Sequence, residues 1–229
     1  MRLCIITARG GSKRIPRKNI KLFLGKPIIA YSISVAIESN IFDEVMVSTD
    51  DSEISQIATR YGAVVPFMRS TKTSDDFATT YDVIEEVVLE YHNLGFRVEQ
   101  ACCIYPTAPF VSVKILHDSF TLLQERKFDI VFPVVRFNSP IQRALKIESG
   151  KVSMIYDENI NKRTQDLIPA YHDAGQFYSF NVPPVIKEKS LMTKNTGAIE
   201  ISEMEAQDID NPTDWELAEF KFQWLHKNK

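Results

Sequence analysis

Cysteine is scarce in this chain, with three residues in 229, and the placement of these residues argues against a disulfide framework or a metal site. Cys4, Cys102 and Cys103 lie in apolar, strand-like runs, and an odd number of thiols cannot pair completely. The four histidines show no metal-ligand spacing either. We therefore expect buried free thiols in a reducing compartment.

Long apolar runs are also missing. No segment approaches the length that a membrane-spanning helix needs. The apolar run at residues 3–7 passes directly into arginine and glycine, so the apolar core of a signal peptide is absent. A net charge of −3 offers no broad basic face for nucleic acid. We expect a cytoplasmic protein with neither a membrane nor a nucleic acid as partner.

The common nucleotide-binding and nucleophile motifs do not occur. The chain contains no G-x-x-x-x-G-K-[ST], no G-x-G-x-x-G and no G-x-S-x-G. It also contains no internal repeat and no low-complexity segment. A nucleotide site in this chain must therefore differ from the Walker loop and from the dinucleotide fingerprint.

The segments that are present alternate between strand and helix patterns over the first 135 residues. A hydrophobic content of 44% and a charged content of 25% are typical of one globular domain, with or without an insertion. This alternation predicts a mainly parallel sheet with helices on both faces. Strands are expected at residues 3–7, 44–49, 63–68, 100–105 and 129–135, and helices at residues 27–39, 52–61, 80–94 and 113–127.

The alternation stops after residue 135. A β-hairpin is predicted at residues 144–155 around Ser149-Gly150, followed by a polar stretch. Strands at residues 176–180 and 198–202 and a final helix at residues 213–227 complete the chain. Residues 136–180 are therefore interpreted as an insertion, either a lid or an arm that reaches a partner subunit.

A glycine-rich basic loop at residues 8–19 directly follows the first predicted strand. Gly10 and Gly11 can adopt backbone angles closed to other residues, so that successive N–H groups converge on one anion. Paired glycines also make ordinary turns, and basic clusters are usually solvated. Because α/β proteins bind ligands beyond the carboxyl ends of their strands, the joint placement favours a polyphosphate site. The cations of this loop are Arg9, Lys13, Arg14, Arg17 and Lys18.

An acidic pair precedes the last predicted helix. Asp208 and Asp210 lie on the same side of an extended segment, where the two charges repel unless a cation lies between them. Hard oxygen ligands suit Mg²⁺. The alternative is a solvated capping cluster, because Asn211-Pro212-Thr213 is also typical of a helix start. A polyphosphate loop in the same chain favours the metal.

Two further groups have open interpretations. Arg143, Lys162, Arg163, His172 and Asp173 lie in the insertion, where they form either a clamp for a carboxylate or a surface network of salt bridges.

The segment Y-P-T-A-P at residues 105–109 contains two prolines, which set a rigid turn that points Tyr105 and Thr107 towards a crevice. By itself this segment is equally consistent with a plain rigid loop.

In chain order, five segments resemble motifs of the acylneuraminate cytidylyltransferases, the family that activates nine-carbon ulosonic acids. The resemblance covers nearly the whole chain. Its segments are residues 8–19, V-S-T-D at 47–50, P-T-A-P at 106–109, Arg163-x-Gln165 and Q-D-I-D at 207–210. Residues 102–109, 139–146 and 170–178 are most similar to the family members that act on pseudaminic acid.

This resemblance implies one cytidylyltransferase domain over residues 1–229. The implied fold is a three-layer nucleotidyltransferase fold of Rossmann-like type, with a mixed, mainly parallel sheet. It also implies an inserted dimerisation arm at about residues 136–180, and hence a homodimer. The implied substrates are CTP and an ulosonic acid, the cofactor is Mg²⁺, and the products are a CMP-sugar and pyrophosphate.

The resemblance assigns roles to residues by position. It places Mg²⁺ at Asp208 and Asp210 and gives these two residues, with Arg9 and Lys18, the catalytic role. The residues implied to bind the nucleotide are Ala8, Arg9, Gly10, Gly11, Ser12, Lys18, Asn19, Arg69, Thr79, Thr80, Pro106 and Thr107. Those implied to contact the sugar are Tyr105, Arg143, Arg163, His172, Gln176 and Tyr178.

Two departures from the family pattern lie where the sugar is expected. Sialic-acid enzymes commonly have Gln-Pro-Thr where this chain has Tyr105-Pro106-Thr107, and Arg-Pro-Asn-Gly where it has residues 172–175. These departures favour pseudaminic acid over sialic acid, which remains an alternative together with other ulosonic acids. A glycosyltransferase usually carries its metal-binding Asp-x-Asp after the fourth strand, where this chain has Tyr105-Pro106-Thr107. A non-catalytic nucleotide-binding regulator would not need both the acidic pair and a sugar-facing arm.

Overall fold

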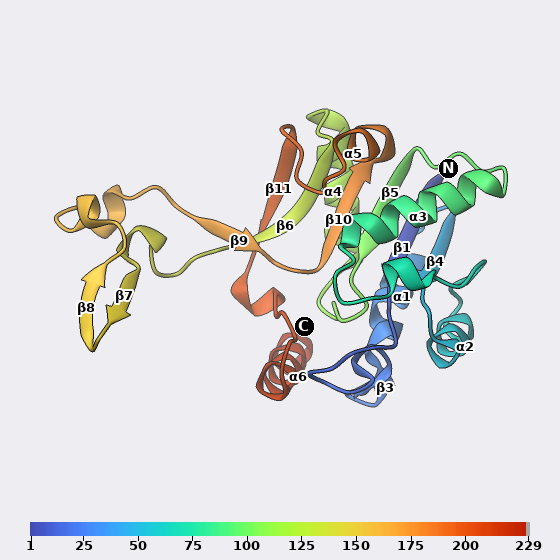
Figure 1. Cartoon of the computed structure of the whole chain (residues 1–229), viewed down its shortest axis with the longest axis horizontal. Coiled ribbons are helices and arrows are strands. Elements are labelled where there is room, and N and C mark those ends of the chain that lie inside the picture. The colour runs from blue at the N-terminus through green and yellow to red at the C-terminus, as the bar shows by residue number, and fades with distance from the viewer. Residues whose placement is uncertain (228–229) are drawn as a thin grey trace.

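The computed structural model describes residues 1–227 and contains a central seven-stranded sheet (Figure 1). Six strands follow the order β11-β6-β10-β5-β1-β4, and the short β9 (Tyr171–Asp173) pairs with β6. Within this sheet of the described residues, β9 and β10 alone run against the direction of the other strands, so the predicted mixed, mainly parallel sheet is confirmed. The strands of the main path are β1 (Arg2–Thr7), β4 (Glu44–Ser48), β5 (Gln100–Ile104), β6 (Ile130–Arg136), β10 (Phe177–Asn181) and β11 (Thr196–Ile201).

Helices cover both faces of the sheet and make a three-layer structure. One face packs against α1 (Ile28–Glu38), α2 (Ser52–Arg60) and α4 (Val113–Glu125), and the other against α3 (Thr80–Asn93) and α5 (Val182–Glu188). None of the helices within residues 1–227 has both the length and the apolarity needed to cross a bilayer.

The cysteines lie inside these layers. Because side chains alternate along a strand, Cys4 and Cys102 face the first helical layer and Cys103 faces the second. All three are free thiols, and burial raises the pKa of each, that of Cys103 to about 12. The expectation of buried free thiols is confirmed.

A separate apolar cluster lies under the last helix, α6 (Pro212–Lys227), beside the two-stranded ribbon of β2 (Leu22–Phe23) and β3 (Lys26–Pro27). The rings of Phe23 and Trp215 pack edge-to-face with centroids 5.6 Å apart. Ile209 is buried in the same cluster, with 1% of its surface exposed. This packing anchors the segment that carries the acidic pair.

The insertion forms an arm that extends away from the sheet (Figure 1). Its strands β7 (Leu145–Glu148) and β8 (Lys151–Met154) pair antiparallel, and Ser149 and Gly150 have φ angles of 50° and 76° at the turn. Positive φ at both turn residues matches the right-handed twist of a two-residue hairpin, so the predicted hairpin is confirmed. The arm ends earlier than the predicted residue 180, because β9 rejoins the sheet and β10 is a buried central strand.

One predicted strand is wrong. Residues 63–68 contribute only an isolated bridge between Val64 and Met46, at the open edge of β4. Pro66 has no amide hydrogen to continue the ladder. The elements that periodicity did not indicate, β2, β3, β9 and α5, are two to seven residues long, too short for a repeat to appear.

Candidate functional site

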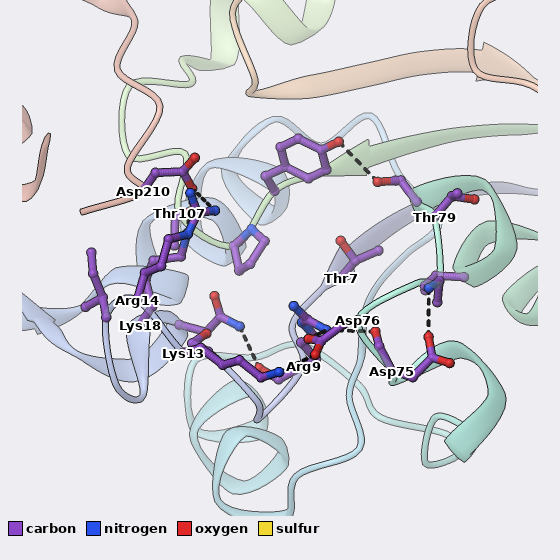
Figure 2. Close-up of a pocket in the computed structure, with 18 of the residues that line it drawn as sticks. Thr7, Arg9, Lys13, Arg14, Lys18, Asp75, Asp76, Thr79, Thr107 and Asp210 are labelled. Atoms are coloured by element: carbon purple, nitrogen blue, oxygen red, sulfur yellow. Dashed lines mark hydrogen bonds and ion pairs between the residues drawn. The ribbon is translucent and has the colours of Figure 1, made fainter.

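A cavity of about 540 Å³ opens beyond the carboxyl ends of β1 and β5 (Figure 2). This is the edge of a parallel sheet at which α/β proteins bind their ligands. The cavity collects every residue implied to bind the nucleotide except Ala8, Gly10 and Gly11. Its polar lining includes Arg9, Ser12, Lys13, Arg14, Lys18, Asn19, Arg69, Thr79, Thr80, Tyr105, Thr107, Asp208 and Asp210.

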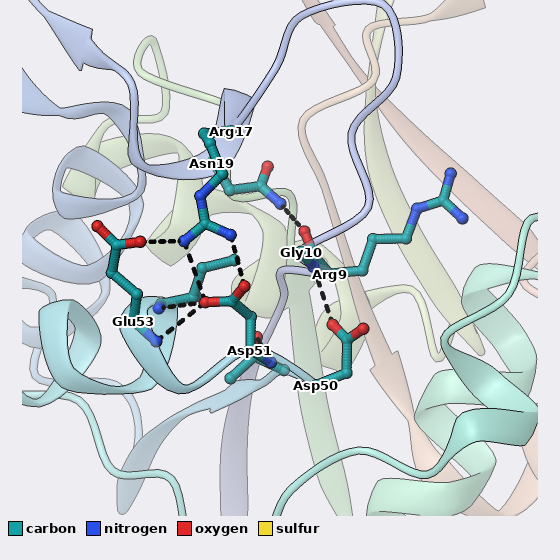
Figure 3. A network of polar contacts seen from close by, with 9 residues as sticks. Arg9, Gly10, Arg17, Asn19, Asp50, Asp51 and Glu53 are labelled. Carbon is teal, nitrogen blue, oxygen red and sulfur yellow. Dashed lines mark hydrogen bonds and ion pairs between the residues drawn. The ribbon is translucent and has the colours of Figure 1, made fainter.

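The glycine-rich loop is shaped by the junction between β4 and α2 (Figure 3). The Gly10 amide donates to Asp50 Oδ1 at 2.8 Å. Arg17 binds both Asp51, at 2.5 and 3.1 Å, and Glu53, at 2.5 Å. Asp51 Oδ1 also accepts the amides of Glu53 and Ile54 and so caps α2. The hydrogen bond from Arg17 holds the pKa of Asp51 down, to about 2.

The role expected for the two glycines is corrected by this geometry. Neither Gly10 nor Gly11 has a positive φ, so neither is required for its backbone angles. A Cβ at Gly10 would lie 2.8 Å from Asp51 Oδ2, whereas one at Gly11 would meet nothing within 4 Å. The close approach to Asp51 explains the need for glycine at residue 10 only. The Gly10 amide donates to the carboxylate of Asp50 and is therefore not free for a phosphate.

The cations of the loop fall into two groups within the cavity. On one side, Arg9 donates to Asp76 at 2.9 Å and to the Asp75 carbonyl at 2.7 Å, and Lys13 also binds Asp76. The hydrogen bond from Lys13, with Arg9 close by, holds the pKa of Asp76 below its usual value. Sequence reasoning missed this acidic segment, although Asp75-Asp76 just before a predicted helix was a visible signal.

On the other side, Arg14 and Lys18 lie against the acidic pair. Arg14 binds Asp210 at 2.7 Å, and Lys18 Nζ lies 3.7 Å from the same carboxylate. Lys18 also donates to the carbonyl of Ile209 at 2.7 Å. Burial lowers the pKa of Lys18, which the charges of Asp210 and Asp208 partly offset.

The two aspartates face the cavity because Ile209 between them is anchored in the α6 cluster. Burial raises the pKa of Asp208, and the charge of Asp210 raises it further. The start of α6 is instead closed by Asp214, which accepts the amides of Asp210 and Asn211. The carboxylates of the acidic pair are therefore not needed as caps.

This donor set fits Mg²⁺. The ion typically takes one or two carboxylates and completes its shell with phosphate oxygens and water. Within residues 1–227 no group of three or more His, Cys, Asp or Glu side chains has metal-binding geometry, so an all-protein cage is not formed. Two carboxylates beside a cationic loop match a metal that arrives with a phosphate ligand.

The polar groups at the far end of the cavity come from the segment around Arg69, from the start of α3 and from the end of β5. The buried Arg69 guanidinium binds Ser48 through Nε at 2.9 Å and Nη2 at 2.6 Å. Thr79 is occupied by a capping box with Asp82, whereas the Thr80 hydroxyl lies 3.1 Å from that of Tyr105. Burial is the main cause that lowers the pKa of Arg69.

Of the residues implied to contact the sugar, Tyr105 lines the cavity. Tyr178 packs edge-on against Tyr105, with ring centroids 5.9 Å apart. Gln176 is buried, and its side chain donates to the Glu205 carbonyl at 2.5 Å. His172 lies on β9, with its ring 4.9 Å from that of Phe137.

The remaining two, Arg143 and Arg163, belong to the arm and are not brought to the cavity of their own chain (Figure 1). Arg163 forms a two-pronged ion pair with Asp166 at 2.8 and 3.1 Å, and Arg143 donates to the Lys162 carbonyl. The structure therefore divides the predicted group, because Arg143, Lys162 and Arg163 lie on the arm, whereas His172 and Asp173 lie on β9.

The sequence is similar to those of known cytidylyltransferases. The model of a family described as cytidylyltransferase matches residues 3–221. The chain is 39% identical over 227 residues to pseudaminic acid cytidylyltransferase of Campylobacter jejuni, covering 99% of this chain and 98% of that protein. It is 28% identical to CMP-N,N'-diacetyllegionaminic acid synthase of Legionella pneumophila, covering 95% and 94% of the two chains.

A solved structure shares the fold. The structure of CMP:2-keto-3-deoxy-manno-octonic acid synthetase complexed with CTP superimposes with a TM-score of 0.71 at 15% identity, covering 98% of this chain and 99% of that one.

Proposed function

The chain belongs to the cytidylyltransferase family, and we propose that it transfers CMP from CTP to the anomeric hydroxyl of pseudaminic acid. The observation that carries this proposal is the cavity itself, in which a cationic loop faces an acidic pair across the end of the sheet. A triphosphate needs the cationic loop, and a metal-assisted displacement at phosphorus needs the acidic pair. The relatedness to Campylobacter jejuni pseudaminic acid cytidylyltransferase supports the choice of sugar.

The nucleotide is proposed to lie with its triphosphate along the basic loop. Arg9, Lys13 and Lys18 supply positive charge, and a triphosphate would compete with Asp76 for the first two. Ser12 and Asn19 line the same wall. The base and the ribose are then proposed to lie against the remaining nucleotide-binding residues, Arg69, Thr79, Thr80 and Thr107.

The reaction is a displacement at the α-phosphorus. The anomeric oxygen forms the new bond to phosphorus, the bond to the bridging oxygen of the β-phosphate breaks, and pyrophosphate leaves with that electron pair. The hydroxyl proton passes to solvent in this scheme. Lys18 and Arg9 offset the charge that develops on the leaving group. Mg²⁺ held by Asp208 and Asp210 would supply Lewis-acid stabilisation at the α-phosphate.

The aromatic wall supports pseudaminic acid as the sugar. Pseudaminic acid carries two acylated amines and a methyl terminus, whereas sialic acid carries one acylated amine and a glycerol tail. Tyr105 lines the cavity, and the ring of Tyr178 packs behind it with the two centroids 5.9 Å apart. The ring of Phe132 packs in turn against that of Tyr178, with centroids 5.3 Å apart. A wall of this kind offers apolar area to the less hydroxylated sugar.

We also propose a homodimer held by the arm, working in the cytoplasm. Exposed apolar side chains on a protruding hairpin are typical of a surface that another subunit covers. On the hairpin, Ile147 is 73% exposed, and Ile168, elsewhere on the arm, is 80% exposed. In this arrangement Arg143 and Arg163 serve the cavity of the partner rather than that of their own chain. The three buried thiols suit a reducing compartment.

Release of pyrophosphate tests the function directly. Purified protein is mixed with Mg²⁺ and CTP, alone or with pseudaminic acid or sialic acid, and both pyrophosphate and the CMP-sugar are followed. We expect rapid release only with CTP, Mg²⁺ and pseudaminic acid together, and a preference over sialic acid of about 10²-fold or more. Equal turnover with excess chelator would overturn the metal assignment, and equal formation of CMP-sialic acid would overturn the choice of sugar.

A further inference from the structure

A carboxylate of the chain itself already binds two cations of the basic loop inside the cavity (Figure 2). Arg9 Nη1 donates to Asp76 Oδ1 at 2.9 Å, and the Lys13 ammonium binds the other oxygen, Oδ2. Phosphate oxygens accept charge-assisted hydrogen bonds from Arg and Lys in the same way. Asp76 therefore holds these two cations as a phosphate group would, with one oxygen on each.

The backbone around Asp76 is held by contacts other than these ion pairs. The Asp75 carboxylate accepts the amides of Phe77 and Ala78 at 2.9 and 2.8 Å, which turns the chain just before α3. Arg9 also donates to the Asp75 carbonyl at 2.7 Å. The turn and Arg9 therefore keep these contacts when the Asp76 carboxylate is exchanged for another anion.

The two ion pairs lie where solvent reaches them. The side chains of Arg9, Asp76 and Lys13 are 36%, 44% and 77% exposed. Exposed ion pairs are weak because water and salt screen them, so a polyphosphate with several charges can displace one carboxylate. The hydrogen bond from Lys13 lowers the pKa of Asp76, so the competing negative charge is present at neutral pH.

We propose that Asp76 is a built-in counter-ion of the triphosphate site, which the nucleotide displaces on binding and which binds Arg9 and Lys13 again when pyrophosphate leaves. This proposal rests on the proposed function, in which Arg9 faces the leaving group and Lys13 the triphosphate. Cations without such a counter-ion would hold substrate and product more tightly alike, and tight product binding slows turnover. Asp76 therefore weakens the binding of both and favours the release of pyrophosphate.

Asp76→Asn tests the counter-ion, because it removes the charge and keeps the size of the side chain. Binding of inorganic tripolyphosphate, measured by calorimetry without Mg²⁺, reports on the cations independently of turnover. We expect its dissociation constant to fall by about 3- to 10-fold, the scale of two exposed ion pairs. The inhibition constant of pyrophosphate against CTP should fall by a similar factor. Added salt should reduce the difference between the wild type and the variant, because it screens exposed charges.

The matched control is Asp75→Asn. It removes the same charge from the neighbouring residue, whose carboxylate accepts the amides of the turn, and an asparagine oxygen can still accept them. The dissociation constant for tripolyphosphate should stay within about twofold of the wild-type value, because a charge outside the ion pairs acts only through solvent. Asp76→Glu keeps the charge at residue 76 and should stay closer to the wild type than Asp76→Asn does.

Three results would overturn the counter-ion. They are tripolyphosphate binding that is no tighter in Asp76→Asn than in the wild type, no binding by either protein, or equal tightening in Asp75→Asn. Normal wild-type turnover together with any of these results would overturn the counter-ion alone. Tighter binding by Asp76→Asn, with no turnover of CTP and either sugar by the wild type, would instead overturn the proposed function and leave Asp76 as the counter-ion of a site for another polyphosphate.

Discussion

The amide of Gly10 donates to the carboxylate of Asp50 at 2.8 Å, so the loop after β1 is tied to the end of β4. The next acid, Asp51, approaches so closely that a Cβ on residue 10 would lie 2.8 Å from its Oδ2. Arg17 closes the loop from its other end by binding Asp51 and Glu53. The acids of the V-S-T-D-D segment therefore act on the loop, and through it on the position of Arg9 and Lys18.

Gly10→Ala is expected to damage nucleotide binding, and Gly11→Ala is not. The added methyl group at residue 10 must displace Asp51 or the loop, whereas a methyl group at residue 11 meets nothing within 4 Å. We expect the KM for CTP to rise by about 10-fold or more in Gly10→Ala, since small misplacements of binding groups are costly. Steady-state kinetics at saturating sugar measures this. Similar KM values in the two variants would show that the close approach to Asp51 does not position the loop.

Asp51→Asn is expected to lower the free energy of unfolding at neutral pH and to make that free energy less dependent on pH in the acid range. Asparagine keeps the cap of α2, because its oxygen still accepts amides, but it loses the charge that Arg17 binds. The folded-state pKa of about 2 lies below the usual value of 3.8, so the contribution of Asp51 is complete above pH 4 and is lost as the pH falls from about 4 to 2.

The expected size is about 1–2 kcal/mol, allowing for screening of a partly exposed pair. Urea unfolding at pH 7 and pH 3 measures it, and the difference between the wild type and Asp51→Asn should shrink at the lower pH. A constant difference across this range would mean that the cap or packing, rather than the charge, is responsible.

Periodicity predicted the large elements of the fold because their patterns extend over several turns or several strand residues. The limits of α1, α3 and β5 differ from the expected ones by at most one residue. The prediction of a strand at residues 63–68 was wrong because apolar residues alone do not show that a segment lies at the edge of the sheet. Pro66 also interrupts the ladder of hydrogen bonds there.

The site was predictable where one segment supplies several groups, as in the basic loop and the acidic pair. It was not predictable where the partner is distant in sequence. Asp76 lies 67 residues from Arg9, and Asp50 lies 40 residues from Gly10. Nothing local in the sequence indicates that these carboxylates and the loop meet, because that contact depends on the parallel pairing of β1 with β4 and on the path of the chain before α3.

Asp210→Asn is expected to lose most of the activity while the fold survives. The substitution removes one charge from the acidic pair that is proposed to hold Mg²⁺, but leaves the packing of Ile209 and the cap by Asp214 in place. We expect kcat to fall by about 10²-fold or more and higher Mg²⁺ to restore part of it, as for a weakened metal site. Kinetics across a Mg²⁺ titration, with circular dichroism as the check on folding, measures both. An unaltered rate would mean that the pair holds no metal that the reaction uses.

Arg163→Ala is expected to weaken the use of the sugar by about 2–5 kcal/mol in kcat/KM, the scale for truncating one partner of a buried charge pair. Affinity for CTP should hardly change, because Arg163 lies on the arm. Lys18→Ala should weaken CTP binding more than use of the sugar, since Lys18 lines the cavity beside the acidic pair. Substrate titrations of each variant separate the two effects.

Mixing these two impaired variants, assayed at low concentrations of CTP and sugar, tests whether the arm serves the partner. In a mixed dimer, the arm of the Lys18→Ala subunit meets the intact cavity of the Arg163→Ala subunit, and one complete site is formed. Half of randomly formed dimers are mixed and each has one such site, so about a quarter of the wild-type activity should return after unfolding and joint refolding. Each variant refolded alone is the control. If the joint sample recovers no more than the two controls, Arg163 does not act across the dimer, and its ion pair with Asp166 belongs to the surface of the arm.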